Sequence, residues 1–109
     1  MYQGTTPALL LRVKGKDLTG CNVFASIKAG MRVITKTGSD LEMDTDDDDT
    51  LVLCHLTQED TLPLSEGEAD VQVRFINSDG VAEATSKAKI TIESVIYKKV
   101  IEYGDGEET

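Results

Sequence analysis

Apolar and polar residues alternate over short runs along most of this chain, and turn-forming residues end each run. The runs, of about six to nine residues, are Cys21–Ala29, Met31–Thr37, Thr50–Thr57, Glu68–Asn77 and Ala88–Ser94. Successive side chains of a strand point to opposite faces, so this alternation indicates half-buried strands. About seven short antiparallel strands at this spacing predict an Ig-like β-sandwich, with a small barrel as the alternative.

The same alternation predicts which residues face the core. The expected inward sets are Val23, Ala25 and Ile27, then Val52, Cys54 and Leu56, then Val71, Val73 and Phe75, and finally Ile90 and Ile92. Ala8–Val13 reads as a further strand, perhaps at an edge, and Leu41 and Met43 begin another short one. Leu51 and Leu53 leave the inward face of Thr50–Thr57 ambiguous, because both faces of this run are apolar.

Turn and capping signals connect these strands. Gly30 allows a tight turn into a hairpin, and Asn77–Gly80 is the strongest turn signal in the chain. Thr57 followed three residues later by Asp60 has the form of a helix N-cap. Pro63 stops a helix soon afterwards, so one helical turn is expected near residues 58–62.

The end of the chain is harder to assign. Val95–Tyr103 fits either a strand that continues into an exposed arm or a short helix, and it is rich in apolar residues. We expect one β-sandwich domain over residues 1–103 and a flexible acidic tail over residues 104–109.

Charge and hydropathy limit the classes of partner. The chain has 109 residues, with 11 basic against 20 acidic side chains and a net charge of −9. Nucleic-acid affinity depends largely on Lys and Arg neutralising phosphates, so neither nucleic acid nor an anionic membrane is an expected partner. The chain has no apolar stretch of the roughly 20 residues that span a bilayer, and it does not open on a secretory leader. We therefore expect a cytoplasmic product.

Three aspartates suggest a calcium site. Asp44, Asp46 and Asp48 match the first three ligand positions of an EF-hand loop. The loop would then need Gly where Asp49 stands and a bidentate Glu where His55 stands. The acidic run Asp44–Asp49 is therefore a weak calcium candidate, and the alternative is a solvated loop kept open by its own charge.

No catalytic set accompanies these strands. His55 is the one histidine, and its neighbour Cys54 points to the opposite face of the same strand. Cys21 and Cys54 lack the paired spacing of a zinc site and are expected to be buried free thiols. We expect no enzymatic activity and no cofactor.

The order of several blocks resembles a known group of proteins. Met1–Pro7 opens the chain, Asp17–Gly20 precedes an alternating strand, Leu56–Leu62 follows another, and Ser78–Gly80 forms a late turn. This order resembles small proteins encoded in prophages of Gram-positive bacteria. More loosely, it is similar to the Ig-like N-terminal domain of phage upper-baseplate proteins, up to about Ile101. These motifs are structural, so no functional residue carries over.

The resemblance implies a tail or baseplate component that acts through contacts with other phage proteins or with itself, as a homo-oligomer, and that enters the virion. A β-sandwich offers an edge strand and an exposed terminus for such contacts. The candidate interface residues are Tyr2, Pro7, Val95, Tyr97, Val100, Ile101 and Tyr103. Two alternatives stay open: a module that binds carbohydrate or a host surface, and an acidic accessory protein that inhibits a host factor.

Overall fold

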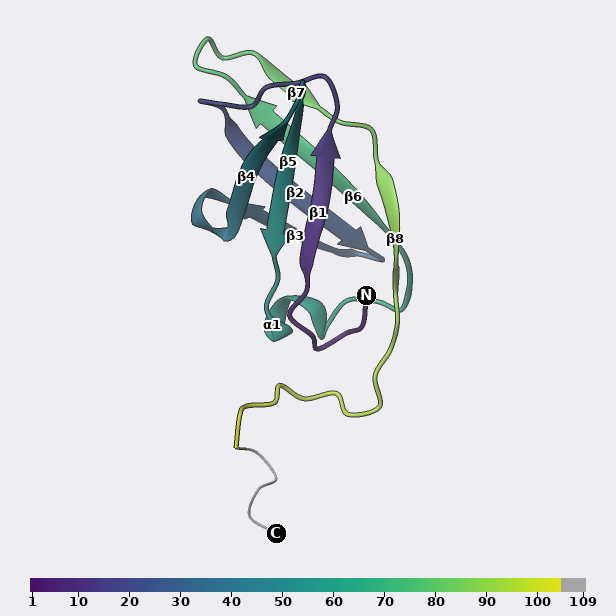
Figure 1. Ribbon diagram of the computed structural model, residues 1–109. Coiled ribbons are helices and arrows are strands. Elements are labelled where there is room, and N and C mark those ends of the chain that lie inside the picture. Colours follow the sequence, from purple (N-terminus) through teal and green to yellow (C-terminus); the bar gives the residue numbers. More distant parts are fainter. Residues whose placement is uncertain (105–109) are drawn as a thin grey trace.

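The computed structural model describes residues 1–104 and shows a β-sandwich with a helical turn at one end (Figure 1). Its strands are β1 (Ala8–Val13), β2 (Asn22–Ala29), β3 (Arg32–Thr37), β4 (Leu41–Asp46), β5 (Asp49–His55), β6 (Gly67–Ile76), β7 (Ala82–Ala84) and β8 (Ala88–Ile92). A short 3-10 helix, Gly38–Asp40, joins β3 to β4, and the helix α1 spans Gln58–Thr61. The five terminal residues of the predicted acidic tail, 105–109, lie outside the described residues.

The strands form two antiparallel sheets. One has three strands in the order β1-β5-β4, and the other has five in the order β3-β2-β6-β7, with β8 also paired to β6 (Figure 1). The ten-residue strand β6 pairs with β8 through its first five residues and with β7 through its last three. The predicted all-β sandwich is confirmed, with eight strands where about seven were expected.

Aliphatic side chains from both sheets fill the space between them. The buried positions alternate as predicted along β2, β5 and β6, which confirms the inward sets on these three strands. On β8 only Ile92 is fully buried, and Ile90 packs against the core from a half-buried position. Leu51 and Leu53 are half-buried, because they lie on the outer face of the middle strand of the smaller sheet.

The acidic run does not form the predicted loop. Residues 44–46 belong to β4 and Asp49 begins β5, so only Asp47 and Asp48 form the turn between them. Asp47 has a φ of 54°, a left-handed conformation that Asp tolerates better than most residues. A tight hairpin therefore replaces the open loop, because pairing of β4 with β5 outweighs repulsion between the carboxylates.

The helical turn closes one end of the sandwich. Thr57 caps α1: its Oγ1 accepts the Asp60 N–H at 3.1 Å while the Asp60 carboxylate accepts the Thr57 N–H at 2.8 Å. This reciprocal pair is the capping box that the sequence predicted. The Thr61 hydroxyl then donates to the Thr5 carbonyl oxygen at 2.8 Å, which fixes the N-terminal segment against the helix.

Residues 1–3 extend the larger sheet, which the sequence pattern did not indicate. Tyr2 forms a parallel bridge with Glu93, just beyond β8. The Glu93 N–H donates to the Met1 carbonyl oxygen at 2.7 Å, and the Gln3 N–H donates to the Glu93 carbonyl oxygen at 2.9 Å. The N-terminus therefore covers one end of the β8 edge (Figure 1).

We predict that Leu18→Ala lowers the free energy of unfolding by about 2–5 kcal/mol, because Leu18 is 1% exposed and its loss leaves a cavity. Leu10→Ala is the matched control, since Leu10 is 63% exposed, and its effect should stay within about 0.5 kcal/mol. Urea unfolding followed by circular dichroism measures both variants. Equal losses in the two variants would contradict the assignment of Leu18 to the core.

Candidate interaction surfaces

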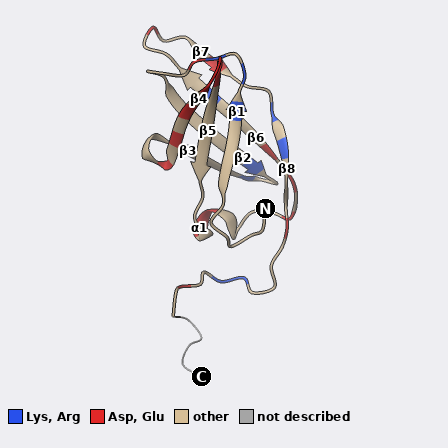
Figure 2. Ribbon diagram, viewed as in Figure 1, with Lys and Arg blue, Asp and Glu red and all other residues tan. Residues whose placement is uncertain are grey.

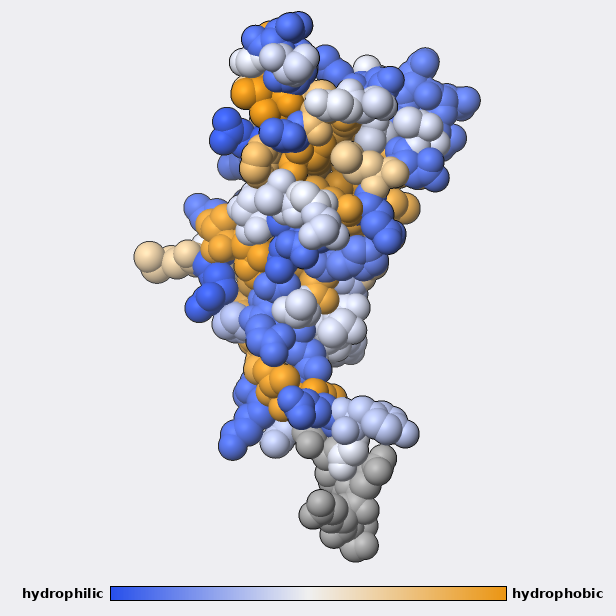
Figure 3. Space-filling model, turned by 90° about the vertical axis from the view of Figure 1, so that its left-hand side faces the viewer, coloured by the Kyte–Doolittle hydropathy of each residue, from blue (hydrophilic) through white to orange (hydrophobic). Residues whose placement is uncertain are grey.

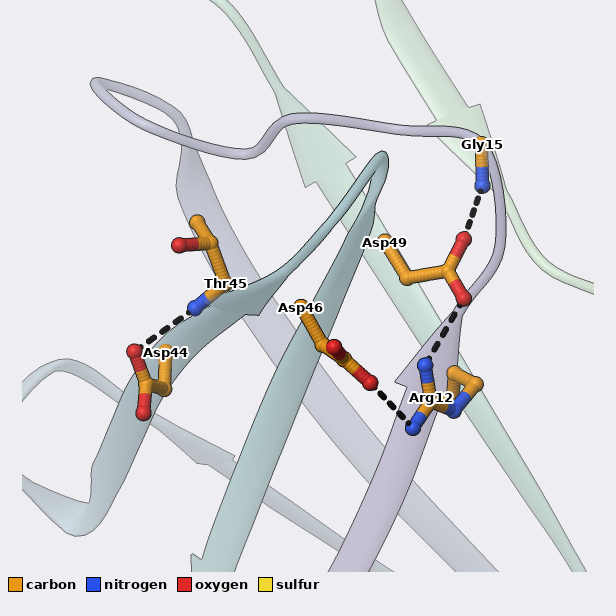
Figure 4. A network of polar contacts seen from close by, with 6 residues as sticks. All are labelled: Arg12, Gly15, Asp44, Thr45, Asp46 and Asp49. Atoms are coloured by element: carbon orange, nitrogen blue, oxygen red, sulfur yellow. Dashed lines mark hydrogen bonds and ion pairs between the residues drawn. The ribbon is translucent and has the colours of Figure 1, made fainter.

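The aspartates of the β4–β5 hairpin are held by a cation and by backbone groups (Figure 4). Arg12 on β1 contacts Asp46 at 2.9 Å and Asp49 at 2.8 Å, and the Gly15 N–H donates to Asp49 at 2.8 Å. The Gly15 N–H, followed by Arg12, lowers the pKa of Asp49. Asp44 lies apart from Arg12 and accepts the N–H of Thr45 at 2.8 Å (Figure 4). Arg12 thus joins the hairpin to β1 through two ion pairs.

The three candidate calcium ligands are not brought together. Asp46 points to Arg12, Asp44 lies apart from that pair on the same strand, and Asp48 lies in the turn. Among residues 1–104 no group of three or more His, Cys, Asp or Glu side chains could hold a metal ion. The described geometry gives Asp44, Asp46 and Asp48 no shared coordination site.

His55 and the cysteines are separated as the strand geometry predicted. His55 is exposed and lies 3.4 Å from the Glu42 carboxylate on the neighbouring strand. Cys54 is buried, and burial raises the pKa of its thiol, which keeps it protonated. Cys21 is half-buried, and both cysteines are free. These three residues do not form a nucleophilic arrangement.

One ion pair lies partly buried between the sheet and the helix. Lys36 on β3 contacts the Asp60 carboxylate at 2.8 Å, and the two side chains are only 18% and 17% exposed. The hydrogen bond to Asp60 raises the pKa of Lys36. Burial would raise the pKa of Asp60, but the hydrogen bonds from Lys36 and Thr57 outweigh burial and lower it. The pair fixes α1 onto the edge of the larger sheet.

Residues 95–103, here called the arm, leave the sandwich after β8 and form neither the strand nor the helix that the sequence suggested (Figure 1). The helix is absent, and of the other alternative only the exposed arm is present, because this segment runs beyond the sheets, where no strand is available for pairing. Its apolar residues stay at the surface (Figure 3). Ile96 and Tyr103 are fully exposed, Tyr97 and Ile101 are more than half exposed, and Val100 is 39% exposed.

The candidate interface residues therefore fall into two places. Tyr97, Val100, Ile101 and Tyr103 lie on the arm, and Val95 is half-buried at its start. Tyr2, which is exposed, and Pro7 belong to the N-terminal segment. Pro7 is half-buried, and its carbonyl oxygen accepts the Leu56 N–H at 3.1 Å, which continues the pairing of β1 with β5.

Two polar contacts tether the arm to the sandwich, and sequence reasoning missed both. The side chain of Gln58 on α1 holds the Ile101 backbone at two points: it donates to the carbonyl oxygen at 2.7 Å and accepts the N–H at 2.8 Å. Nearer the sandwich, Lys98 Nζ donates to Gln3 Oε1 at 2.7 Å. Gln3 is itself buried and donates to the Leu64 carbonyl oxygen. A lone Gln in a helix or a turn carries no sequence signal for such contacts.

A groove of about 510 Å³, here called the open groove, lies on one side of the sandwich between β1 and the β7–β8 region. Its apolar lining comes from β1 and from the inner face of β6. The lining includes Leu10, Leu11, Val13, Val71, Val73, Phe75, Glu83, Ala84, Thr85, Ser86 and Ala88, with Lys14 and Lys16 also on its border. Val13, Val71, Val73 and Phe75 at its base are all buried, and Lys16 contacts Glu83 at its border at 3.0 Å.

A second apolar surface lies on the outer face of the smaller sheet. Leu10, Leu51 and Leu53 lie in a shallow depression beside Glu42 and Asp44. A symmetric dimer through this face would bring identical carboxylates together, because two-fold contacts use the same patch on both subunits. Like charges brought together at an interface oppose binding. This face is therefore the weaker candidate for self-association.

Charged residues are distributed unevenly (Figure 2). Acidic residues follow β4 and lie on α1, whereas lysines lie on β8 and on the arm. Lys89 of β8 contacts Asp70 at 2.8 Å, and Lys98 of the arm donates a hydrogen bond to Gln3. The lysines of β8 and of the arm thus lie on two different segments, and Lys89 and Lys98 are both partnered.

Comparison with protein-family models, with curated proteins and with solved structures gives no match. In the described part of the chain, no helix is long and apolar enough to cross a membrane.

We predict that Asp60→Asn lowers the free energy of unfolding near pH 7 by about 1–2 kcal/mol, since it removes the charge from a partly buried pair. The pKa of Asp60 in the folded protein lies below the ordinary value of 3.8, so its charge stabilises the fold above about pH 4. That contribution disappears as the pH falls through the folded-state pKa. The difference in the free energy of unfolding between the natural chain and Asp60→Asn should therefore shrink towards pH 2.

Urea unfolding at both pH values tests this expectation. The control is Asp70→Asn, which removes one partner of an exposed ion pair and should cost no more than about 1 kcal/mol. A deficit of Asp60→Asn that is the same at both pH values would show that the Asp60 charge contributes nothing.

We predict that Gln58→Ala frees the arm, because it removes both hydrogen bonds to the Ile101 backbone. Trypsin should then cleave after Lys98 and Lys99 several-fold faster while the sandwich stays folded. Glu59→Ala, an exposed change on the same helix, is the control and should leave the rate unchanged. Equal cleavage rates in the two variants would mean that Gln58 does not hold the arm.

Proposed function

We propose that this protein is a non-enzymatic structural or assembly component that acts through protein–protein contacts. The observation that carries the proposal is the arm, where apolar residues project from a folded sandwich into solvent. Exposed apolar surface of this kind is typical of interaction sites in soluble proteins. The described residues Cys54, His55 and Asp44–Asp49 meanwhile form ordinary structural contacts.

For the assembly itself we propose a phage or prophage tail or baseplate. The support is the resemblance of Met1–Pro7, Asp17–Gly20 and Leu56–Leu62 to small prophage proteins. The strand order further supports an Ig-like lineage. The sheet β1-β5-β4 corresponds to strands B, E and D of an Ig domain, and β3-β2-β6 with β7 and β8 corresponds to C′, C, F and G.

The carbohydrate-binding alternative has less support. Tyr97 and Tyr103 are well exposed, but they lie on the arm and not in the lining of the open groove. A sugar ring stacked on either tyrosine would therefore lack the second wall that a binding cleft supplies.

We predict that the full chain forms a discrete oligomer, or a stoichiometric complex with the product of a neighbouring gene. Light scattering at several protein concentrations measures the first, and co-expression followed by co-purification measures the second. Added calcium should leave the mass unchanged, because Asp46 and Asp49 are engaged by Arg12. A protein that stays monomeric and retains no neighbouring gene product would contradict a structural role.

A further inference from the structure

We propose that copies of this chain stack head to tail, with the outer face of the smaller sheet of one copy against the outer face of the larger sheet of the next. The first surface, here called the leucine face, carries Leu10, Leu51 and Leu53 with Glu42 and Asp44. The second surface, here called the arginine face, carries Phe24, Arg74, Ile76 and Ala82 with Lys28. This inference rests on the proposed function, because it names one way in which the protein assembles.

The register of the smaller sheet places the leucines beside carboxylates. Leu10 on β1 lies opposite Leu53 on β5, which in turn lies opposite Glu42 on β4. Leu51 lies opposite Asp44 in the same sheet. The buried residues of β5 alternate with these leucines, so the leucines face outward. Leu10 is 63% exposed, and the leucine face is therefore open to solvent.

The leucine face keeps two carboxylates that no lysine or arginine neutralises. Arg12, its one cation, is already shared by two aspartates of the β4–β5 hairpin. Glu42 has His55 beside it at 3.4 Å, and Asp44 accepts the N–H of Thr45. Within residues 1–104 no lysine or arginine contacts Glu42 or Asp44. The charge left over on this face is negative.

The arginine face carries the opposite charge. Arg74 on β6 and Lys28 on β2 are exposed, and their side chains have no partner in the described part of the chain. Lys89 of β8 takes up the acids of the same face, since it lies 2.8 Å from Asp70 and 3.9 Å from Glu68. The charge left over on this face is positive.

An apolar depression adjoins Arg74. It has a volume of about 380 Å³, and its lining includes Phe24, Ile76 and Ala82. Phe24 is 37% exposed and lies directly opposite Arg74 on the neighbouring strand. Aromatic residues and arginine are enriched in protein–protein interfaces, and they supply most of the residues that dominate binding energy. The arginine face thus has the composition of a contact surface.

A second copy is the occupant that these charges favour. Repulsion makes the leucine face the weaker candidate only where it meets its own copy, as in a two-fold dimer. Against the arginine face of another copy, Glu42 and Asp44 meet Arg74 and Lys28, and the leucines meet Phe24. An apolar centre with opposite charges around it gives a contact both burial and a fixed orientation.

The two faces lie on opposite sides of the molecule, because they are the outer faces of two stacked sheets (Figure 1). The arm leaves from the end that carries α1, where Gln58 holds it, so it covers neither face (Figure 1). Each copy can therefore present one face and receive the other. Contacts of this kind close into a ring where the rotation between copies allows it, and otherwise continue as an open stack.

Reversing the charges of one face at a time tests the proposal in the full chain. One variant combines Lys28→Glu with Arg74→Glu, and the other combines Glu42→Lys with Asp44→Lys. Each variant alone should need at least about a tenfold higher concentration than the natural chain to associate, measured by light scattering up to about 1 mM. An equal mixture of the two should associate again, because every contact between unlike variants joins opposite charges.

Matched controls make the same changes in net charge away from both faces. Lys14→Glu with Arg32→Glu, and Glu59→Lys with Glu66→Lys, alter exposed side chains and should leave association unchanged. Circular dichroism and urea midpoints confirm that every variant is folded.

Three results would overturn the inference: a natural chain that stays monomeric up to about 1 mM, association that survives reversal of either face, or a mixture of the two variants that stays monomeric. Controls that lose association as fully as the face variants would also overturn it, since net charge alone would then govern association. If the natural chain is monomeric but binds a neighbouring gene product, the inference fails and the proposed function stands.

Discussion

A sheet of three strands packs against a sheet of five, and their inner faces share one aliphatic core. The wider sheet depends on β6, whose ten residues pair with β2 on one side and with β7 and β8 in turn on the other. The narrower sheet ends at β1 before it covers the full width of its partner. The open groove follows from this mismatch, and so does the unpaired edge beside it.

The end of the sandwich that carries α1 is closed by polar contacts rather than by strands. Asp60 serves both the capping box of α1 and the ion pair with Lys36, so one carboxylate joins the helix to the larger sheet. Gln58 on the same helix and Gln3 of the N-terminal segment then hold the arm. The position of the arm therefore depends on a few hydrogen bonds at the surface, which can be exchanged for others at low cost.

Groups that suggested chemistry in the sequence have structural roles in the fold. Arg12 draws Asp46, one of the three candidate calcium ligands, and Asp49 to β1, and these two carboxylates stabilise the hairpin. Cys54 belongs to the core, and His55 lies on the outer face beside Glu42. What the molecule offers to others is surface: an apolar arm and a strand edge with one charge.

Local pattern was sufficient for much of the fold, because strand alternation, turns and caps depend on neighbouring residues. Val23, Val52 and Val71 were assigned to the core by alternation alone, and Thr57 was identified as a cap from its spacing to Asp60. Three features join residues that lie far apart in the chain: the pairing of Tyr2 with Glu93, the hydrogen bonds between Gln58 and Ile101, and the groove beside β1. Those contacts depend on which strands become neighbours and on where the narrower sheet ends, so only the tertiary structure decided them.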